Sequence, residues 1–151
     1  MASFDGLLMS RIALANIFFG FVVIVLSSLA GFFLATEAEQ AFLTDKHLVM
    51  AWEYTLFKSA HGHCNLFGLL HIAMGLSMPY ARLSSRWQLI ESGGLFLGSF
   101  TMGCLMMVRS LRGIPTPGSD WLGICIGLLL SASLAALLIH SYGLAKKLLR
   151  G

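Results

Sequence analysis

Charged side chains are scarce in this chain of 151 residues, at 11% of the composition, against about 25% in soluble domains. Hydrophobic residues make up 57%, and the mean hydropathy is +0.81. A particle of 16.4 kDa cannot hide so much apolar surface from water, or stay dissolved with so few charges. The composition therefore excludes a soluble globular domain, a disordered chain and a nucleic-acid-binding domain, and it predicts an integral membrane protein.

Cysteine and proline are also few, with three residues of each. The cysteines are too scattered for a disulfide framework or a zinc ribbon, and each stands in an apolar run, where we expect a small packed side chain; they are Cys64, Cys104 and Cys125. Two of the prolines, Pro115 and Pro117, stand just before Gly118 and predict a turn-rich connection.

Four apolar runs, at 12–35, 57–79, 87–108 and 121–144, are long enough to cross a bilayer, which takes about 20 mostly apolar residues in a helix. The first run exceeds the roughly 7–15 residues of a signal-peptide core, so we expect it to be retained. The four runs use nearly all of the apolar residues. We therefore expect one all-α domain over 1–151, a four-helix membrane bundle with helices at about 11–36, 50–80, 87–110 and 120–147.

The basic residues predict the orientation of this bundle. Four crossings place both termini and the second connection on one side of the membrane, which then carries six basic residues against four on the other. The acidic residues of the connections lie on the other side, Asp5 apart. By the positive-inside rule we expect both termini in the cytoplasm of a bacterial-type inner membrane. The six basic residues are Arg11, Arg82, Arg86, Lys146, Lys147 and Arg150.

The second run holds an unusual group of polar residues: His61, His63, Asn65 and His71 lie within 11 residues of each other. Ionisable groups in the hydrocarbon are costly and usually mark a site, and imidazole is a common metal ligand. At 100° per residue His61 and Asn65 share a face, with Gly62 and Gly68 leaving room for a flat macrocycle, whereas His63 points about 160° away. One metal ion therefore cannot take all three histidines.

Cations and a thioether are expected near His61. Lys58 is one turn away on the same face, and Arg109 and Arg112 follow the third run at the same membrane surface. Haem propionates at that level would need such cations, although ordinary snorkelling explains them equally well. Met106 and Met107 lie at the predicted depth of His61, either as a second haem or copper ligand or as packing.

Two predictions concern hydrogen bonds inside the membrane. One nitrogen of His61 should donate to an oxygen, from Ser59 or from a backbone carbonyl, and so fix the tautomer of the ring. Glu91 and His140 lie at a similar depth on the third and fourth runs. Each is otherwise an isolated ionisable group in the bilayer, so we expect the two to pair, as a structural clasp rather than a proton relay.

The sequence Ala60-His61, with six residues to Gly68 and ten more to Pro79, resembles the second helix of the styrene oxide isomerase family. Members of that family are small four-helix membrane proteins that hold haem b through an Ala-His histidine. The segment from His61 to Gly68 is also similar to the His-x-His-x-Asn-Leu-x-Gly of small four-helix proteins related to haem–copper oxidase subunit I. The resemblance covers about 50 residues and ends with the third run.

The isomerase resemblance implies that His61 is the axial ligand of haem b. His63, on another face of the same helix, is the alternative ligand. It also implies a homotrimer with haem near the protomer contacts. In that family ferric haem acts as a Lewis acid on an epoxide oxygen, and an aldehyde forms by hydride shift. The family's active-site asparagine and tyrosine fall at Phe67 and Met106, so this chain departs from the pattern at both, and Asn65 is placed to replace the first.

Three functions therefore remain open at the level of sequence. The first is a haem-dependent isomerase of a small hydrophobic epoxide that arrives from the lipid. The second is a haem b electron carrier or quinone-linked subunit, in which His61 and a methionine or second histidine hold the iron. The third is an accessory subunit of a respiratory membrane complex without a cofactor. An optical spectrum separates them, because the first needs an open coordination position and the third gives no haem band.

Overall fold

The computed structural model describes residues 9–44, 52–115, 118 and 120–149, and within them it contains helices and no strand. The first half holds α1 (Arg11–Thr44), α2 (Trp52–Ser77) and a short 3-10 helix, η3 (Met78–Tyr80). The second half holds α3 (Ser85–Phe100), a π-helix η4 (Thr101–Leu105), α4 (Met106–Leu111) and α5 (Trp121–Leu148). Because α3, η4 and α4 follow without a break, the described residues form four long helical segments, and the predicted all-α class is confirmed.

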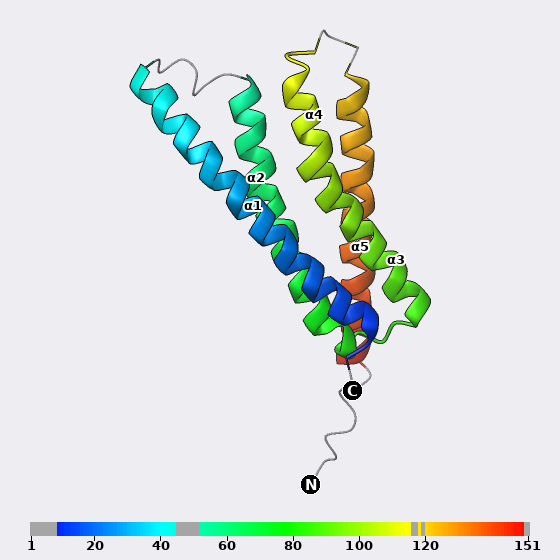
Figure 1. The fold of residues 1–151 in the computed structure, drawn as a ribbon. Helices are drawn as coiled ribbons and strands as arrows, with labels where there is room; N and C mark the ends of the chain where they lie inside the picture. The colour runs from blue at the N-terminus through cyan, green and yellow to red at the C-terminus, as the bar shows by residue number, and fades with distance from the viewer. Residues whose placement is uncertain (1–8, 45–51, 116–117, 119, 150–151) are drawn as a thin grey trace.

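The four segments pack as two pairs (Figure 1). Helix α1 lies along α2, and α3 lies along α5. The start of α1, the η3 turn and the end of α5 gather at one end of the bundle. The two pairs diverge toward the other end, where α1 and α4 end and α2 and α5 begin. We call these the closed end and the splayed end.

Three of the segments are long and apolar enough to cross a membrane: Arg11–Glu37, Ser85–Leu111 and Trp121–Leu148. Helix α2 has 26 residues, but its three histidines and Asn65 make it less apolar than the other three. Large apolar side chains are exposed on every segment, as in Phe18 at 71% and Leu69 at 58%. Such a surface suits contact with lipid rather than water.

The first helix is longer than its apolar run predicts. Helix α1 continues to Thr44 rather than ending near residue 36. The added segment is rich in Glu, Ala and Gln. These residues favour helix, so the helix continues beyond the apolar run into a part that suits water rather than lipid. The remainder of the first connection, 45–51, lies outside the described residues, as does the predicted start of the second helix at about residue 50.

Small residues allow the helices of each pair to approach closely. A Cβ atom added at Gly20 would lie 2.5 Å from the carbonyl oxygen of Gly68, and one at Gly75 would lie 2.6 Å from that of Ala13. On the other pair, a Cβ atom at Gly94 would lie 2.8 Å from the Cβ of Ala136. Close backbone contact of this kind is how helices associate in lipid, where no hydrophobic effect drives them together.

Two buried polar groups tie the helices together. The ring nitrogens of His71 lie 2.8 Å from Asn16 Oδ1 on α1 and 3.1 Å from Ser99 Oγ on α3. Near the closed end, His140 Nδ1 lies 3.2 Å from Glu91 Oε1, which confirms the predicted pair between the third and fourth segments. The other nitrogen, Nε2, lies 2.7 Å from the hydroxyl of Ser77 on α2. The pair therefore joins three helices.

Candidate functional site around His61

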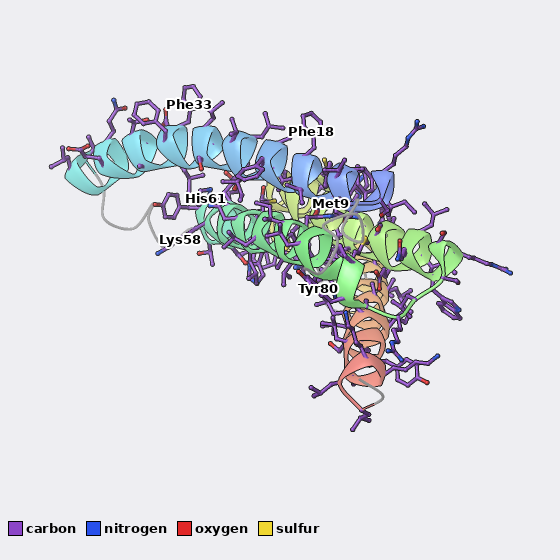
Figure 2. All side chains as sticks on the ribbon, turned by 90° about the horizontal axis from the view of Figure 1, so that it is seen from below. Met9, Phe18, Phe33, Lys58, His61 and Tyr80 are labelled. Atoms are coloured by element: carbon purple, nitrogen blue, oxygen red, sulfur yellow. The ribbon has the colours of Figure 1, made fainter. Side chains whose placement is uncertain are left out.

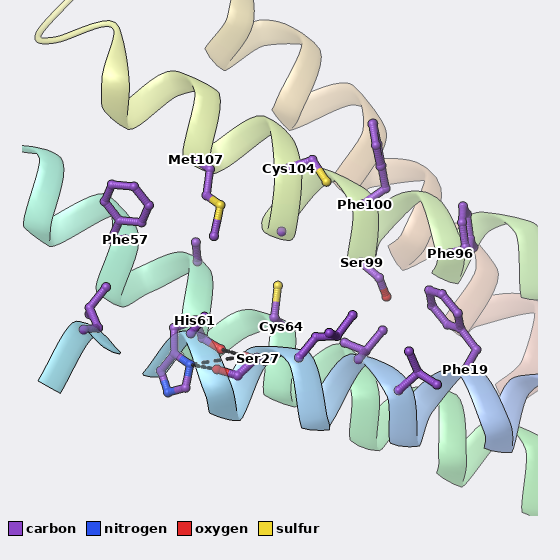
Figure 3. Close-up of a pocket in the computed structure, with 17 residues that line it drawn as sticks. Phe19, Ser27, Phe57, His61, Cys64, Phe96, Ser99, Phe100, Cys104 and Met107 are labelled. Atoms are coloured by element: carbon purple, nitrogen blue, oxygen red, sulfur yellow. Dashed lines mark hydrogen bonds between the residues drawn. The ribbon is translucent and has the colours of Figure 1, made fainter. Parts of the chain in front are cut away.

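His61 lies where α2 contacts α1, and its ring is oriented by the backbone of α1 (Figure 3). Its Nδ1 is 2.8 Å from the carbonyl oxygen of Ser27, whose hydroxyl in turn donates to the carbonyl of His61 at 3.0 Å. A carbonyl oxygen only accepts, so Nδ1 carries the proton and Nε2 keeps its lone pair. The prediction that an oxygen fixes the tautomer is confirmed, with a backbone carbonyl as the partner rather than Ser59.

The imidazole of His61 lies in a notch of α1, which is the space left by the missing side chain of Gly31. A Cβ atom at Gly31 would lie 2.3 Å from His61 Cε1 and 2.7 Å from Nε2, so only glycine leaves space for the ring in this position. On the other side, a Cβ atom at Gly62 would meet nothing within 4 Å. The ring is thus fixed against α1 while the helix beside it borders open space.

Asn65 stands one turn along α2 from His61, on the same face as the sequence predicts. Its Nδ2 lies 3.5 Å from His61 Nε2, which is the far limit of a hydrogen bond. Its Oδ1 is buried and has no partner among the described residues. A buried amide oxygen without a partner is rare and marks a place where a further group can bind.

The chemistry of these donors fits a haem better than a bare metal ion. Within the described part of the chain, no three His, Cys, Asp or Glu side chains come together as a metal site. A haem supplies its own ring nitrogens and needs one strong protein ligand, commonly a neutral histidine whose other nitrogen donates to a carbonyl. His61 has this arrangement, and the unpartnered Oδ1 of Asn65 lies next to it.

An apolar cavity of about 420 Å³ lies between α1, α2 and the α3–η4–α4 segment (Figure 3). This is within the range of small-molecule sites, about 300–1,000 Å³. Its few polar contributors include Ser27 and His61, although the ring of His61 points toward α1 and away from Met107. The cavity therefore borders the histidine site and suits a small uncharged molecule. The aromatic residues and the methionine of its wall are Phe19, Phe57, Phe96, Phe100 and Met107.

The other two histidines of α2 have different surroundings. His63 is exposed, and its Nδ1 lies 2.8 Å from the carbonyl of Ser59, so its Nε2 also keeps a lone pair. It lines a shallow hollow with Lys58 on the outside of α2. His71 is buried with both nitrogens engaged, as described above, and has no nitrogen left for a metal. The three histidines do not share one site, as their helical spacing predicts.

Several residues assigned from the sequence lie away from His61. Phe67 and Met106 belong to the packed core and its border, and neither lines the cavity. Gly68 does not border open space, because a Cβ atom there would lie 2.5 Å from Ile24 Cγ1 on α1. Of the two glycines that the sequence suggests would leave room beside His61, Gly68 is filled by α1, whereas Gly62 borders open space as predicted.

The two arginines near the splayed end are engaged with partners of their own. Arg109 forms an ion pair with Asp120 and lies 5.1 Å from the ring centre of Trp52. Arg112 lies 5.1 Å from the ring centre of Trp121. The Arg109 hydrogen bond, followed by the amide of Gly123 at 2.8 Å, lowers the pKa of the Asp120 carboxyl. Of the three predicted propionate partners, Arg109 is in an ion pair, whereas Lys58 and Arg112 are exposed and form no ion pair within the described residues.

Two contributors to the site were missed by the sequence argument. Ser27 and Gly31 are four residues apart in the apolar run of α1, as helical neighbours on one face are. That spacing is the only signal available, and it does not reveal which residue of α2 they meet. The π-helix at Thr101–Leu105, which brings Gly103 and Cys104 to the cavity wall, was also not predicted. Helical turns of this kind often occur at functional sites.

Comparisons of the chain with family models, with curated proteins and with solved structures found no match.

Proposed function

We propose that this protein binds haem b in the membrane and that Nε2 of His61 is the axial ligand. The observation that carries the proposal is the hydrogen bond from His61 Nδ1 to the carbonyl of Ser27, at 2.8 Å. It holds the imidazole in the tautomer that binds iron and fixes the direction of the lone pair.

We further propose that the protein isomerises a small hydrophobic epoxide to an aldehyde. The bound haem would supply a Lewis acid for the epoxide oxygen. The chain itself would bind the apolar body of the substrate in the cavity, whose wall is almost entirely hydrocarbon, and exclude water from it. The amide of Asn65, beside His61 Nε2, would orient the oxygen of the substrate by a hydrogen bond.

The alternative function is haem b electron transfer, alone or as part of a respiratory membrane complex. One observation favours it: His63 also has Nδ1 bound to a carbonyl and a free Nε2, on an exposed face. In a homo-oligomer, such as the trimer that the family resemblance implies, His63 of a second protomer could complete the coordination of one iron. The two functions therefore differ in whether a coordination position is open.

The optical spectrum of the purified protein distinguishes these functions. A five-coordinate ferric haem, with an aldehyde produced from a small aryl or alkyl epoxide, supports the isomerase. A six-coordinate low-spin haem that loses its second ligand in His63→Ala supports electron transfer. A preparation supplied with haem that shows no haem band would refute both functions.

The same proposal includes four crossings with the closed end in the cytoplasm of a bacterial-type inner membrane. The cations of this end support it, since basic residues favour the cytoplasmic side. A reporter enzyme that is active only in the cytoplasm should be active when it is fused after Arg150. Activity of a periplasmic reporter at that position would contradict the orientation.

A further inference from the structure

A groove of about 560 Å³ lies at the closed end of the bundle, between the start of α3 and the last turns of α5. It is distant from the histidine site, since His61 lies toward the start of α2 and Tyr80 of η3, two residues before Arg82, lies beyond its other end (Figure 2). Its lining joins a basic part to an apolar part along α5. The residues are Arg82, Leu83, Ser84, Trp87, Leu138, Ile139, Tyr142 and Lys146.

The basic part of the groove is held in place but not neutralised. The backbone amide of Arg82 donates to the carbonyl of Gly143 at 3.3 Å, which keeps Arg82 beside α5. Neither Arg82 nor Lys146 forms an ion pair within the described residues. The single acidic residue in the described part of this end, Glu91, is fully buried and bonded to His140. The groove therefore presents positive charge that has no counter-charge among the residues that the structure describes.

The apolar part of the groove is open to the surroundings. Leu138 is 71% exposed, Tyr142 is 65% exposed and Trp87 is 48% exposed. Tryptophan and tyrosine are typical of the membrane–water interface, where one end of the side chain is apolar and the other is wet. Leu138 and Ile139 extend the groove along α5 as an aliphatic strip, which matches the path of an acyl chain.

We propose that this groove binds an anionic phospholipid. The headgroup phosphate would lie between Arg82 and Lys146, and one acyl chain would follow Leu138 and Ile139. Basic pockets between helices at the cytoplasmic surface are a known way to hold anionic headgroups. A second copy of this chain is a poor occupant, because its closed end carries the same positive charge and like charges repel across an interface.

The experiment measures lipid binding by the full-length protein in detergent, by native mass spectrometry, with phosphatidylglycerol and with phosphatidylcholine of identical chains. The wild type should retain phosphatidylglycerol preferentially. Each of Arg82→Gln and Lys146→Gln should weaken its binding about tenfold, the loss expected for one charged hydrogen bond. The matched control is Arg86→Gln, which removes the same charge at the same end but outside the groove lining, and it should bind like the wild type.

Two further measurements separate a lipid from a free phosphate. Leu138→Gln keeps both cations, and it should weaken lipid binding if an acyl chain lies in the groove. Inorganic phosphate at millimolar concentration should not displace the lipid. Equal retention of the two lipids, equal losses in Arg82→Gln and Arg86→Gln, or full displacement by phosphate would each overturn the proposal. Haem content plays no part in these measurements, so the lipid site and the haem site can fail separately.

Discussion

Replacing Gly31 with alanine should displace the ring of His61 although His61 itself is unchanged. The new Cβ would lie 2.3 Å from His61 Cε1, whereas carbon atoms pack at about 3.5 Å or more. The ring or the helix must therefore move by about 1.2 Å, the difference between these distances. A shift of that size stretches the 2.8 Å bond from Nδ1 to the Ser27 carbonyl beyond hydrogen-bonding range.

The cost follows from these two effects. Overpacking a filled site costs about 1–3 kcal/mol, and a lost hydrogen bond about 0.5–1.5 kcal/mol. The better helix propensity of alanine offsets up to about 1 kcal/mol of this. We expect a lower melting temperature in detergent. Loss of the carbonyl that orients a ligand histidine should also weaken haem binding about 10–100-fold.

The assay is a haem titration of the haem-free protein, followed by absorbance, together with thermal unfolding. Gly127→Ala is the matched control, since it makes the same chemical change in α5 where an added Cβ meets nothing within 4 Å. It should keep the wild-type affinity, with a stability equal to or up to about 1 kcal/mol above that of the wild type because alanine favours helix. If Gly31→Ala binds haem with the affinity and band position of the wild type, the notch does not orient the ligand and the reasoning fails.

Three other changes test the remaining polar contacts. Glu91→Ala removes the buried hydrogen bond to His140 and should cost about 1–3 kcal/mol of stability, seen as a lower melting temperature with haem binding intact. His71→Ala removes two buried hydrogen bonds and leaves a cavity, at a cost of about 2–4 kcal/mol, again without loss of haem; parallel loss of haem would contradict the separate roles of the two histidines. Asp120→Asn breaks the ion pair with Arg109 and should lower the melting temperature at pH 7. Because that pair lowers the pKa of Asp120 from 3.8, its stabilisation is complete above pH 3.8 and disappears as the pH falls through the lowered value. A difference between Asp120→Asn and wild type that grows on acidification would show that the sign is wrong.

The fold could be predicted largely from apolar runs, because in lipid every backbone polar group must bond within its own helix. The ends of the helices were harder to predict from the sequence. Helix α1 continues to Thr44 because its polar residues are good helix formers, and hydropathy does not report that preference. The π-turn at Thr101–Leu105 has no residue pattern in the sequence that we can identify.

The candidate site could be predicted only as far as α2 alone defines it. Spacing along one helix separated the three histidines and put Asn65 on the face of His61. It could not show that Gly31 and Ser27 hold the ring, because the register of α1 against α2 depends on glycine contacts across the pair. It also placed room beside Gly68, where the close approach of α1 leaves none. Glu91 and His140 were paired correctly because two isolated ionisable groups at one depth have few other partners.

The most direct test of the account is the haem content of the protein with single histidine substitutions. Wild type, His61→Ala, His63→Ala and His71→Ala are expressed with haem supply, purified alike and compared by the absorbance of the pyridine complex per protein. We expect His61→Ala to lose stoichiometric haem b while His63→Ala and His71→Ala keep most of it. Full haem in His61→Ala, with loss in His63→Ala, would assign the iron to the other histidine. Haem retained in all three variants would contradict a haem site on α2.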